Sequence, residues 1–115
     1  MRLHDTNIAG LSRVPAHLDL LDFTRCVELR YRWEDAVELV LRLASDAGDL
    51  ELALRGVRSI RIPELSPWFW TSELEIDDLR SQQLEGIKFR LIESDGDRLA
   101  ISCEHIECLS FTPST

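Results

Sequence analysis

The stretch LELALRGVRSIRIPELSPWFW, residues 50–70, decides the fold that the sequence predicts. Leucines occupy every second position from Leu50 to Leu54, which is the pattern of a β-strand with one buried face. Gly56 interrupts this alternation, and Ile60 resumes it. A glycine inside a strand pattern is typical of a bulge or a sharp change of direction, because glycine has no Cβ to restrict φ. We therefore predict a strand that bends at Gly56.

The same alternation precedes this stretch. The run Arg25–Trp33 places apolar residues at every second position, and a similar run follows the polar break Glu34-Asp35. The expected inward rows are Val27, Leu29, Tyr31 and Trp33 in the first run, and Val37, Leu39, Leu41 and Leu43 in the second. Two half-buried strands joined by a short polar break predict a β-hairpin. The turn-forming residues Ser45–Asp49 then lead into Leu50.

A second hairpin is predicted near the end of the chain. The expected inward residues are Ile87, Phe89 and Leu91 before the turn, and Leu99, Ile101 and Cys103 after it. The turn is Asp95-Gly96, and Asp-Gly between alternating runs is a strong hairpin signal. Ile106 and Cys108 have the opposite parity to Cys103, so we predict a bulge or break near Glu104-His105.

The segment Ser72–Leu84 fits two structures. Ser72 and Glu75 match a helical capping box, whereas Leu74 and Ile76 alternate as in a strand. We favour a short strand followed by a polar loop. The chain then has about seven strands and little helix. Since a sheet must cover its apolar face, residues 1–115 are expected to form a single, mainly β domain, either an antiparallel β-sandwich or a strongly curled sheet.

The charge limits the classes of partner. The 115 residues carry a formal net charge of −8, which would repel a phosphate backbone or an anionic membrane. We therefore predict no nucleic-acid or membrane partner, whereas a basic protein partner and plain solubility both fit. The sequence has no apolar run of about 20 residues and no secretory signal, which favours a cytoplasmic location. The arginines mostly share strands with glutamates, which predicts cross-strand ion pairs.

The run Cys103–Cys108 brings together two thiols and an imidazole, all of which can bind zinc. Cys103, His105 and Cys108 are thus weak candidates for a metal site, with Cys26 or His4 as a distant fourth ligand. Their spacing matches no familiar zinc motif, so we interpret them as two core cysteines and a surface histidine. No catalytic set and no cofactor-binding loop are found in the sequence. Three cysteines without an export signal are expected to be free thiols.

Trp68, Phe69 and Trp70 form the densest aromatic cluster and follow Pro67. Large aromatic residues are enriched at binding hot spots, but they also build cores. Three consecutive residues of an extended segment cannot all face one core. We therefore predict that at least one of the three is partly exposed. Core packing is the favoured interpretation of the cluster, and a contact with a partner or a second copy of the chain is the alternative.

Several short motifs resemble those of uncharacterised small bacterial β-rich proteins. They are the Leu-His-Asp start, the Gly-Val strand ending in proline, the Pro-Trp dipeptide followed by serine, and a late Gly-Asp, here Leu3-His4-Asp5-Thr6, Gly56-Val57 to Pro63, Pro67-Trp68 with Ser72, and Gly96-Asp97. This chain departs from that pattern at Phe69-Trp70, where a glycine commonly follows the Pro-Trp, and by extra residues between Ser12 and Phe23. The chain is also similar to some β-rich immunity proteins of bacterial polymorphic-toxin systems. That resemblance implies a small, acidic, cytoplasmic binder that neutralises a partner protein, and it assigns no catalytic residues.

Three functions follow as hypotheses. The first is a non-enzymatic protein-interaction module, immunity-like, that uses an acidic surface and exposed aromatic residues. The second is a small-ligand or metal-binding β domain with Cys103, His105 and Cys108 as its local ligands. The third is a structural protein that associates with itself.

Overall fold

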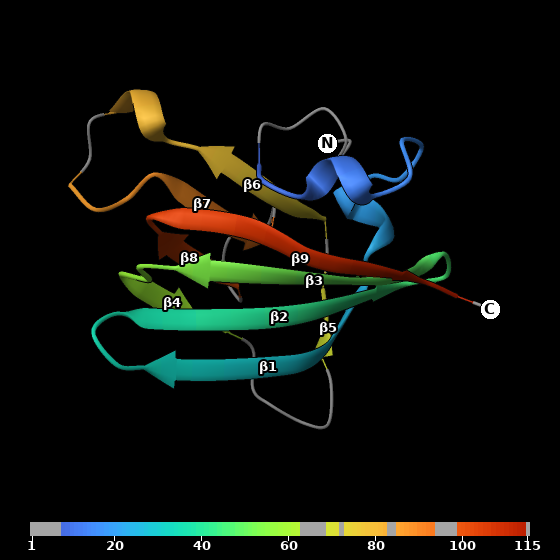
Figure 1. The fold of residues 1–115 in the computed structure, drawn as a ribbon, viewed down its shortest axis with the longest axis horizontal. Helices are drawn as coiled ribbons and strands as arrows, with labels where there is room; N and C mark the ends of the chain where they lie inside the picture. The colour runs from blue at the N-terminus through green and yellow to red at the C-terminus, as the bar shows by residue number, and fades with distance from the viewer. Residues whose placement is uncertain (1–7, 63–68, 72, 83–84, 94–98, 115) are drawn as a thin grey trace.

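The computed structural model describes residues 8–62, 69–71, 73–82, 85–93 and 99–114. They form two antiparallel sheets, one behind the other in Figure 1. The first sheet has five strands in the order β5 (Phe69–Trp70), β1 (Arg25–Trp33), β2 (Val37–Ser45), β3 (Gly48–Arg55) and β9 (His105–Pro113). The second has four, in the order β4 (Ser59–Arg61), β8 (Ala100–Cys103), β7 (Phe89–Glu93) and β6 (Leu74–Asp78). The predicted fold class, a mainly β sandwich, is confirmed, with nine described strands rather than about seven.

The two hairpins built by β1, β2 and β3 follow directly from the alternation. Trp33 pairs with Val37 across the first turn, and Ser45 pairs with Gly48 across the second. The Ser45 hydroxyl donates to the Gly48 carbonyl at 2.8 Å and accepts from its N–H at 3.2 Å, which closes the tight turn. Both predicted turns, at Glu34-Asp35 and within Ser45–Asp49, are confirmed.

The chain passes between the two sheets at a corner formed by Gly56 and Glu104. Gly56 has a φ of 64° and separates β3 from β4, while Glu104 separates β8 from β9. The Glu104 N–H donates to the carbonyls of Arg55, at 3.0 Å, and of Gly56, at 3.2 Å. Sandwich corners are commonly made by strands that bend from one sheet into the other. The predicted bend at Gly56 and the predicted break beside Glu104 are both confirmed.

The core lies between the sheets and is built by the inward rows of both. The five-stranded sheet contributes Leu39, Leu41, Leu43, Leu50, Leu52 and Leu54, and the four-stranded sheet contributes Leu74, Ile76, Phe89, Leu91, Ile101 and Cys103. Burying each large aliphatic side chain stabilises the fold by roughly 1.5–3 kcal/mol. The segment before β1 closes this core with Leu11, Val14, Leu18, Leu20 and Phe23, and it contains the 3-10 turns η2 (Leu11–Arg13) and η3 (Leu20–Asp22).

The ambiguous segment after position 72 is a strand and not a helix. Leu74–Asp78 is β6, and a single 3-10 turn, η4 (Arg80–Gln82), follows it. β7 and β8 pair as an antiparallel hairpin, although the predicted Asp95-Gly96 turn lies outside the described residues. The motifs around Leu3-His4-Asp5-Thr6, Pro63 and Pro67-Trp68 also lie outside them. No helix among the described residues is long and apolar enough to cross a membrane.

Candidate protein-binding surface

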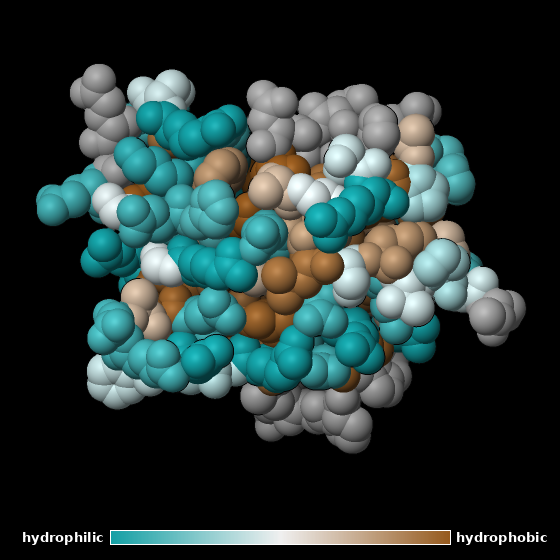
Figure 2. Space-filling view, viewed as in Figure 1, coloured by the Kyte–Doolittle hydropathy of each residue, from teal (hydrophilic) through white to brown (hydrophobic). Residues whose placement is uncertain are grey.

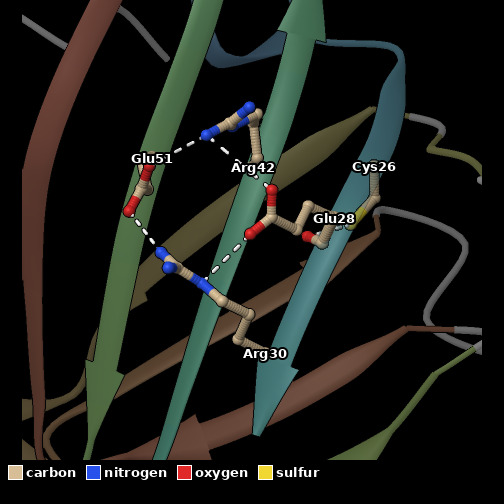
Figure 3. Close-up of polar contacts among 5 residues, drawn as sticks. All are labelled: Cys26, Glu28, Arg30, Arg42 and Glu51. Carbon is tan, nitrogen blue, oxygen red and sulfur yellow. Dashed lines mark hydrogen bonds and ion pairs between the residues drawn. The ribbon is translucent and has the colours of Figure 1, made fainter.

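The outward face of the five-stranded sheet carries a ring of four alternating charges. The strand register places Glu28 opposite Arg42 and Arg42 opposite Glu51, so these three side chains lie in one row across β1, β2 and β3. Directly opposite residues share a face, and opposite charges there attract each other. Arg30, two residues along β1 from Glu28, completes the ring (Figure 3).

The ring is closed by four ion pairs. Arg30 lies 3.1 Å from Glu28 and 2.5 Å from Glu51, while Arg42 lies 3.7 Å from Glu28 and 3.6 Å from Glu51. The side chain of Glu51 is the most buried member, with 18% of its surface exposed. Two positive and two negative charges cancel within the ring. The predicted cross-strand pairing of arginines with glutamates is confirmed here.

Arg55 forms a second ion-pair group on the same face. Its guanidinium donates to Glu107 on β9 and, at 3.1 Å, to Glu38 on β2. The hydrogen bond with Glu107 raises the pKa of Arg55, and the same bond lowers the pKa of Glu107. Val40 and Ala53 are also buried on this face, and Figure 2 shows hydrophobic residues, in brown, between the hydrophilic ones, in teal. This face is mostly self-neutralised, which leaves few charges for a partner.

The end of the β1–β2 hairpin is different, because two large aromatic residues are exposed there. Tyr31 is 56% exposed and Trp33 is 73% exposed. The sequence pattern predicted that both would lie in the inward row of a half-buried strand. The register confirms the side of the sheet, because Tyr31 lies opposite Leu39, but the predicted burial of the two side chains is wrong. The strand order explains part of this exposure. Tyr31 lies opposite the buried Leu39, but β1 is one strand further than β2 from the centre of the sheet. The only hint in the sequence was their position, at the last two inward places before a turn.

Among the described residues, the edge of β1 is also unpaired over most of its length. β5 pairs with β1 only at Arg25 and Cys26, and the register shifts beyond Cys26. From Glu28 to Trp33, β1 pairs on one side only among the described residues. An unpaired edge beside exposed aromatic side chains is a surface on which a partner protein can dock.

Two carboxylates lie in the turn next to these aromatic residues. Glu34 pairs with Arg32 at 3.0 Å, and both side chains are exposed. Asp35 is exposed and has no ion pair with any residue that the structure describes. We call Tyr31, Trp33, Glu34 and Asp35 the hairpin tip. It combines apolar area with a negative charge that no described residue neutralises.

The predicted interaction cluster is only partly described. Phe69 and Trp70 form β5, where Phe69 pairs with Cys26 and Trp70 pairs with Arg25, and Trp68 lies outside the described residues. The strand therefore sits at the edge of the five-stranded sheet, next to β1. A role for Trp68, Phe69 and Trp70 in binding stays a prediction.

The weak metal candidates are separated by the corner at Glu104. Cys103 is fully buried in β8, Cys108 is buried in β9, and His105 is exposed at the start of β9. Burial raises the pKa of the Cys103 thiol to about 12 and that of the Cys26 thiol to about 11. No three His, Cys, Asp or Glu side chains among the described residues are grouped as a metal site, and His4 lies outside them. Cys26, Cys103 and Cys108 are free thiols, as predicted.

A shallow hollow of about 460 Å³ lies on the outward face of the four-stranded sheet. Small side chains of β4 and β8 contribute to its lining, and Arg61 and Arg90 lie among them. Arg90 is paired with Asp77 of β6 at 3.1 Å. The described lining contains no His, Cys, Asp or Glu, the residue types that most often act as general acids, bases or metal ligands.

Comparison with known proteins gives one finding. The model of the family described as Immunity protein PIM8 matches residues 12–108, which include all of the described strands except the end of β9. The chain therefore belongs to this family. No curated protein and no solved structure matches the chain.

Proposed function

Because the chain belongs to an immunity protein family, we propose that it neutralises a bacterial toxin by binding it and without catalysis. The family match over residues 12–108 carries this proposal. It also agrees with the resemblance to polymorphic-toxin immunity proteins found in the sequence. The toxin would act inside the producing cell, so we also propose a cytoplasmic location, where the three free thiols stay reduced.

Two features of the surface support a binding role. Exposed tryptophan and tyrosine side chains are the residue types most enriched at binding hot spots, and the hairpin tip presents one of each. The net charge of −8 would attract a basic partner at long range and would speed its association. Neither feature requires a catalytic group.

The stoichiometry of neutralisation tests the proposal. The partner to use is the protein encoded by the adjacent reading frame, expressed as its toxic domain. A fixed amount of that domain is titrated with this chain, and residual toxin activity is measured after a short and a long incubation. We expect activity to fall linearly and to vanish near equimolar amounts, with no dependence on incubation time. Neutralisation by a small fraction of an equivalent, increasing with time, would instead show catalysis.

Two further measurements complete the test. Co-expression should restore growth of cells that produce the toxic domain, and size-exclusion chromatography should show a complex of the two chains. The same column run with this chain alone reports self-association, which is the competing structural role. No complex and no rescue would contradict the proposed function.

A further inference from the structure

We propose that the hairpin tip, composed of Tyr31, Trp33, Glu34 and Asp35, is the surface that grips a cationic patch of the toxin, with arginine or lysine side chains on the two aromatic faces. This inference rests on the proposed function. It goes beyond that function by naming the docking surface and the chemistry of the partner.

Two exposed aromatic side chains define the docking surface. Tyr31 and Trp33 lie two residues apart on one strand, so their side chains are on the same face. That face is the core side of the sheet, as the pairing of Tyr31 with Leu39 shows, but the tip is exposed. Exposing two large apolar side chains side by side on a folded surface is typical of an interaction site. Their π faces also attract arginine and lysine cations.

The charges at the tip favour a partner surface of positive charge. Asp35 has no ion pair with a described residue, and Glu34 has one, to Arg32. The ion-pair ring and the Arg55 group, by contrast, use their charges internally. A cationic patch would find a carboxylate at the tip that is not already neutralised by the described chain. The net charge of −8 favours the same kind of partner at long range.

Arg32 competes with the partner's cations for Glu34. Its guanidinium lies 3.0 Å from the Glu34 carboxylate, and that hydrogen bond raises the pKa of Arg32. Removing the Arg32 charge would free Glu34 for a partner cation. We therefore expect opposite effects from two neighbouring substitutions: Asp35→Asn weakens binding, and Arg32→Gln strengthens it.

The experiment measures the affinity of this chain for the toxic domain of the adjacent reading frame, with its activity removed by mutation, using titration calorimetry. Trp33→Ala is expected to raise Kd about 30-fold or more, as loss of a hot-spot residue does. Asp35→Asn is expected to raise Kd about 3-fold to 10-fold, and Arg32→Gln to lower it about 3-fold. These charge effects should shrink in 0.5 M NaCl, because salt screens exposed charges.

Two matched controls stand elsewhere on the surface. Leu21→Ala removes another exposed apolar side chain, which lies in η3. Asp46→Asn removes the same charge as Asp35→Asn, but from the β2–β3 turn, at the other end of the sheet from the hairpin tip (Figure 1). Both should leave Kd within twofold of the wild type. Since Trp33 is largely exposed, its variant should keep the wild-type melting temperature.

The outcomes separate the docking surface from the function. If the wild type binds and the tip variants bind equally well, the docking surface is wrong while the function stands. The same conclusion follows if only Trp68→Ala weakens binding, because that would place the contact at the predicted aromatic cluster. If Arg32→Gln weakens binding, the partner presents an acidic patch and the proposed chemistry is wrong. Failure of the wild type to bind overturns both proposals.

Discussion

At the scale of single residues, Gly56 is the position where the backbone depends most directly on residue type. Its φ of 64° is in the left-handed region, which costs an L-residue roughly 1–2 kcal/mol. A Cβ at this position would also lie 2.8 Å from the Cβ of Glu104. We expect Gly56→Ala to lower the free energy of unfolding by about 2–3 kcal/mol, measured by urea denaturation.

Gly86→Ala is the matched control for this substitution. Gly86 has a similar φ of 72°, but the atoms that a Cβ would meet belong to the end of the Arg58 side chain, which can move aside. Gly86→Ala should lower the free energy of unfolding only by the cost of the left-handed backbone conformation, about 1–2 kcal/mol. The double variant Gly56→Ala, Glu104→Gly should recover part of the loss, because it removes the facing Cβ. Equal costs at positions 56 and 86 would show that the contact with Glu104 is unimportant.

At the scale of elements, the ion-pair ring connects three strands through one partly buried carboxylate, Glu51. Glu51 lies on β3 and pairs with both Arg30 of β1 and Arg42 of β2. Glu51→Gln would leave the two arginines with Glu28 alone. We expect it to lower the free energy of unfolding by about 1–2 kcal/mol, which is more than an exposed ion pair contributes. Chemical denaturation at low salt measures this.

Glu34→Gln serves as the control, since it removes the same charge from the turn between β1 and β2. Glu34 and Arg32 are both largely exposed, so their ion pair should contribute less than about 0.5 kcal/mol. In 1 M NaCl the loss caused by Glu51→Gln should diminish but not vanish, because its side chain is mostly shielded from water. Similar small effects of both substitutions would mean that the ring has no stabilising role.

The strands and hairpins were the features that the sequence predicted best. Alternation alone located the β1–β2 hairpin, and the change of parity between Cys103 and Ile106 located the corner at Glu104. Both signals are local, since they depend on neighbouring residues of one strand. The exposure of Tyr31 and Trp33 could not be predicted in this way, because it depends on where the second sheet ends. The ring likewise depends on the register of three strands. The sequence therefore predicted that arginines would pair with glutamates, but not which arginine pairs with which glutamate.

The candidate binding site shows the same limit. The sequence placed it at Trp68, Phe69 and Trp70, because three consecutive large aromatic residues are visible without any structure. The hairpin tip carries a weaker sequence signal, since Tyr31 and Trp33 have the spacing of core residues. Their exposure of 56% and 73% distinguishes them from the leucines with the same spacing on β2. Periodicity predicts which face a residue is on, and the packing of the other sheet decides whether that face is covered.

At the scale of the whole molecule, the thiols link the stability of the fold to pH. Cys26 lies in the five-stranded sheet and Cys103 in the four-stranded sheet, and both belong to the one core that the sheets share. Burial disfavours the thiolate, so the pKa of Cys26 is raised to about 11 and that of Cys103 to about 12, from an ordinary value of 9.0. In the unfolded chain both thiols would ionise near the ordinary value.

The direction of the pH effect follows from this difference. The folded pKa values are above the unfolded ones, so the protonated thiols stabilise the fold fully below about pH 9. That stabilisation is lost as the pH rises towards 11 and 12, because only the unfolded chain releases the protons. Each thiol should contribute a slope of roughly 1.4 kcal/mol per pH unit between these limits. We expect the free energy of unfolding, measured in urea with a reducing agent, to fall steeply between pH 9.5 and 10.5.

Cys103→Ala isolates the contribution of one thiol. It should cost about 1 kcal/mol at pH 7, because it leaves a small cavity. It should also make the decline with pH shallower without abolishing it, because burial raises the pKa of Cys26 and of Cys108 as well. Asp46→Asn, which changes an exposed charge far from the core, should leave the slope unchanged. If the slope of the Cys103→Ala variant equals that of the wild type, then alkaline unfolding has another cause. A shallower slope would instead show that ionisation of the Cys103 thiol in the unfolded chain contributes to alkaline unfolding.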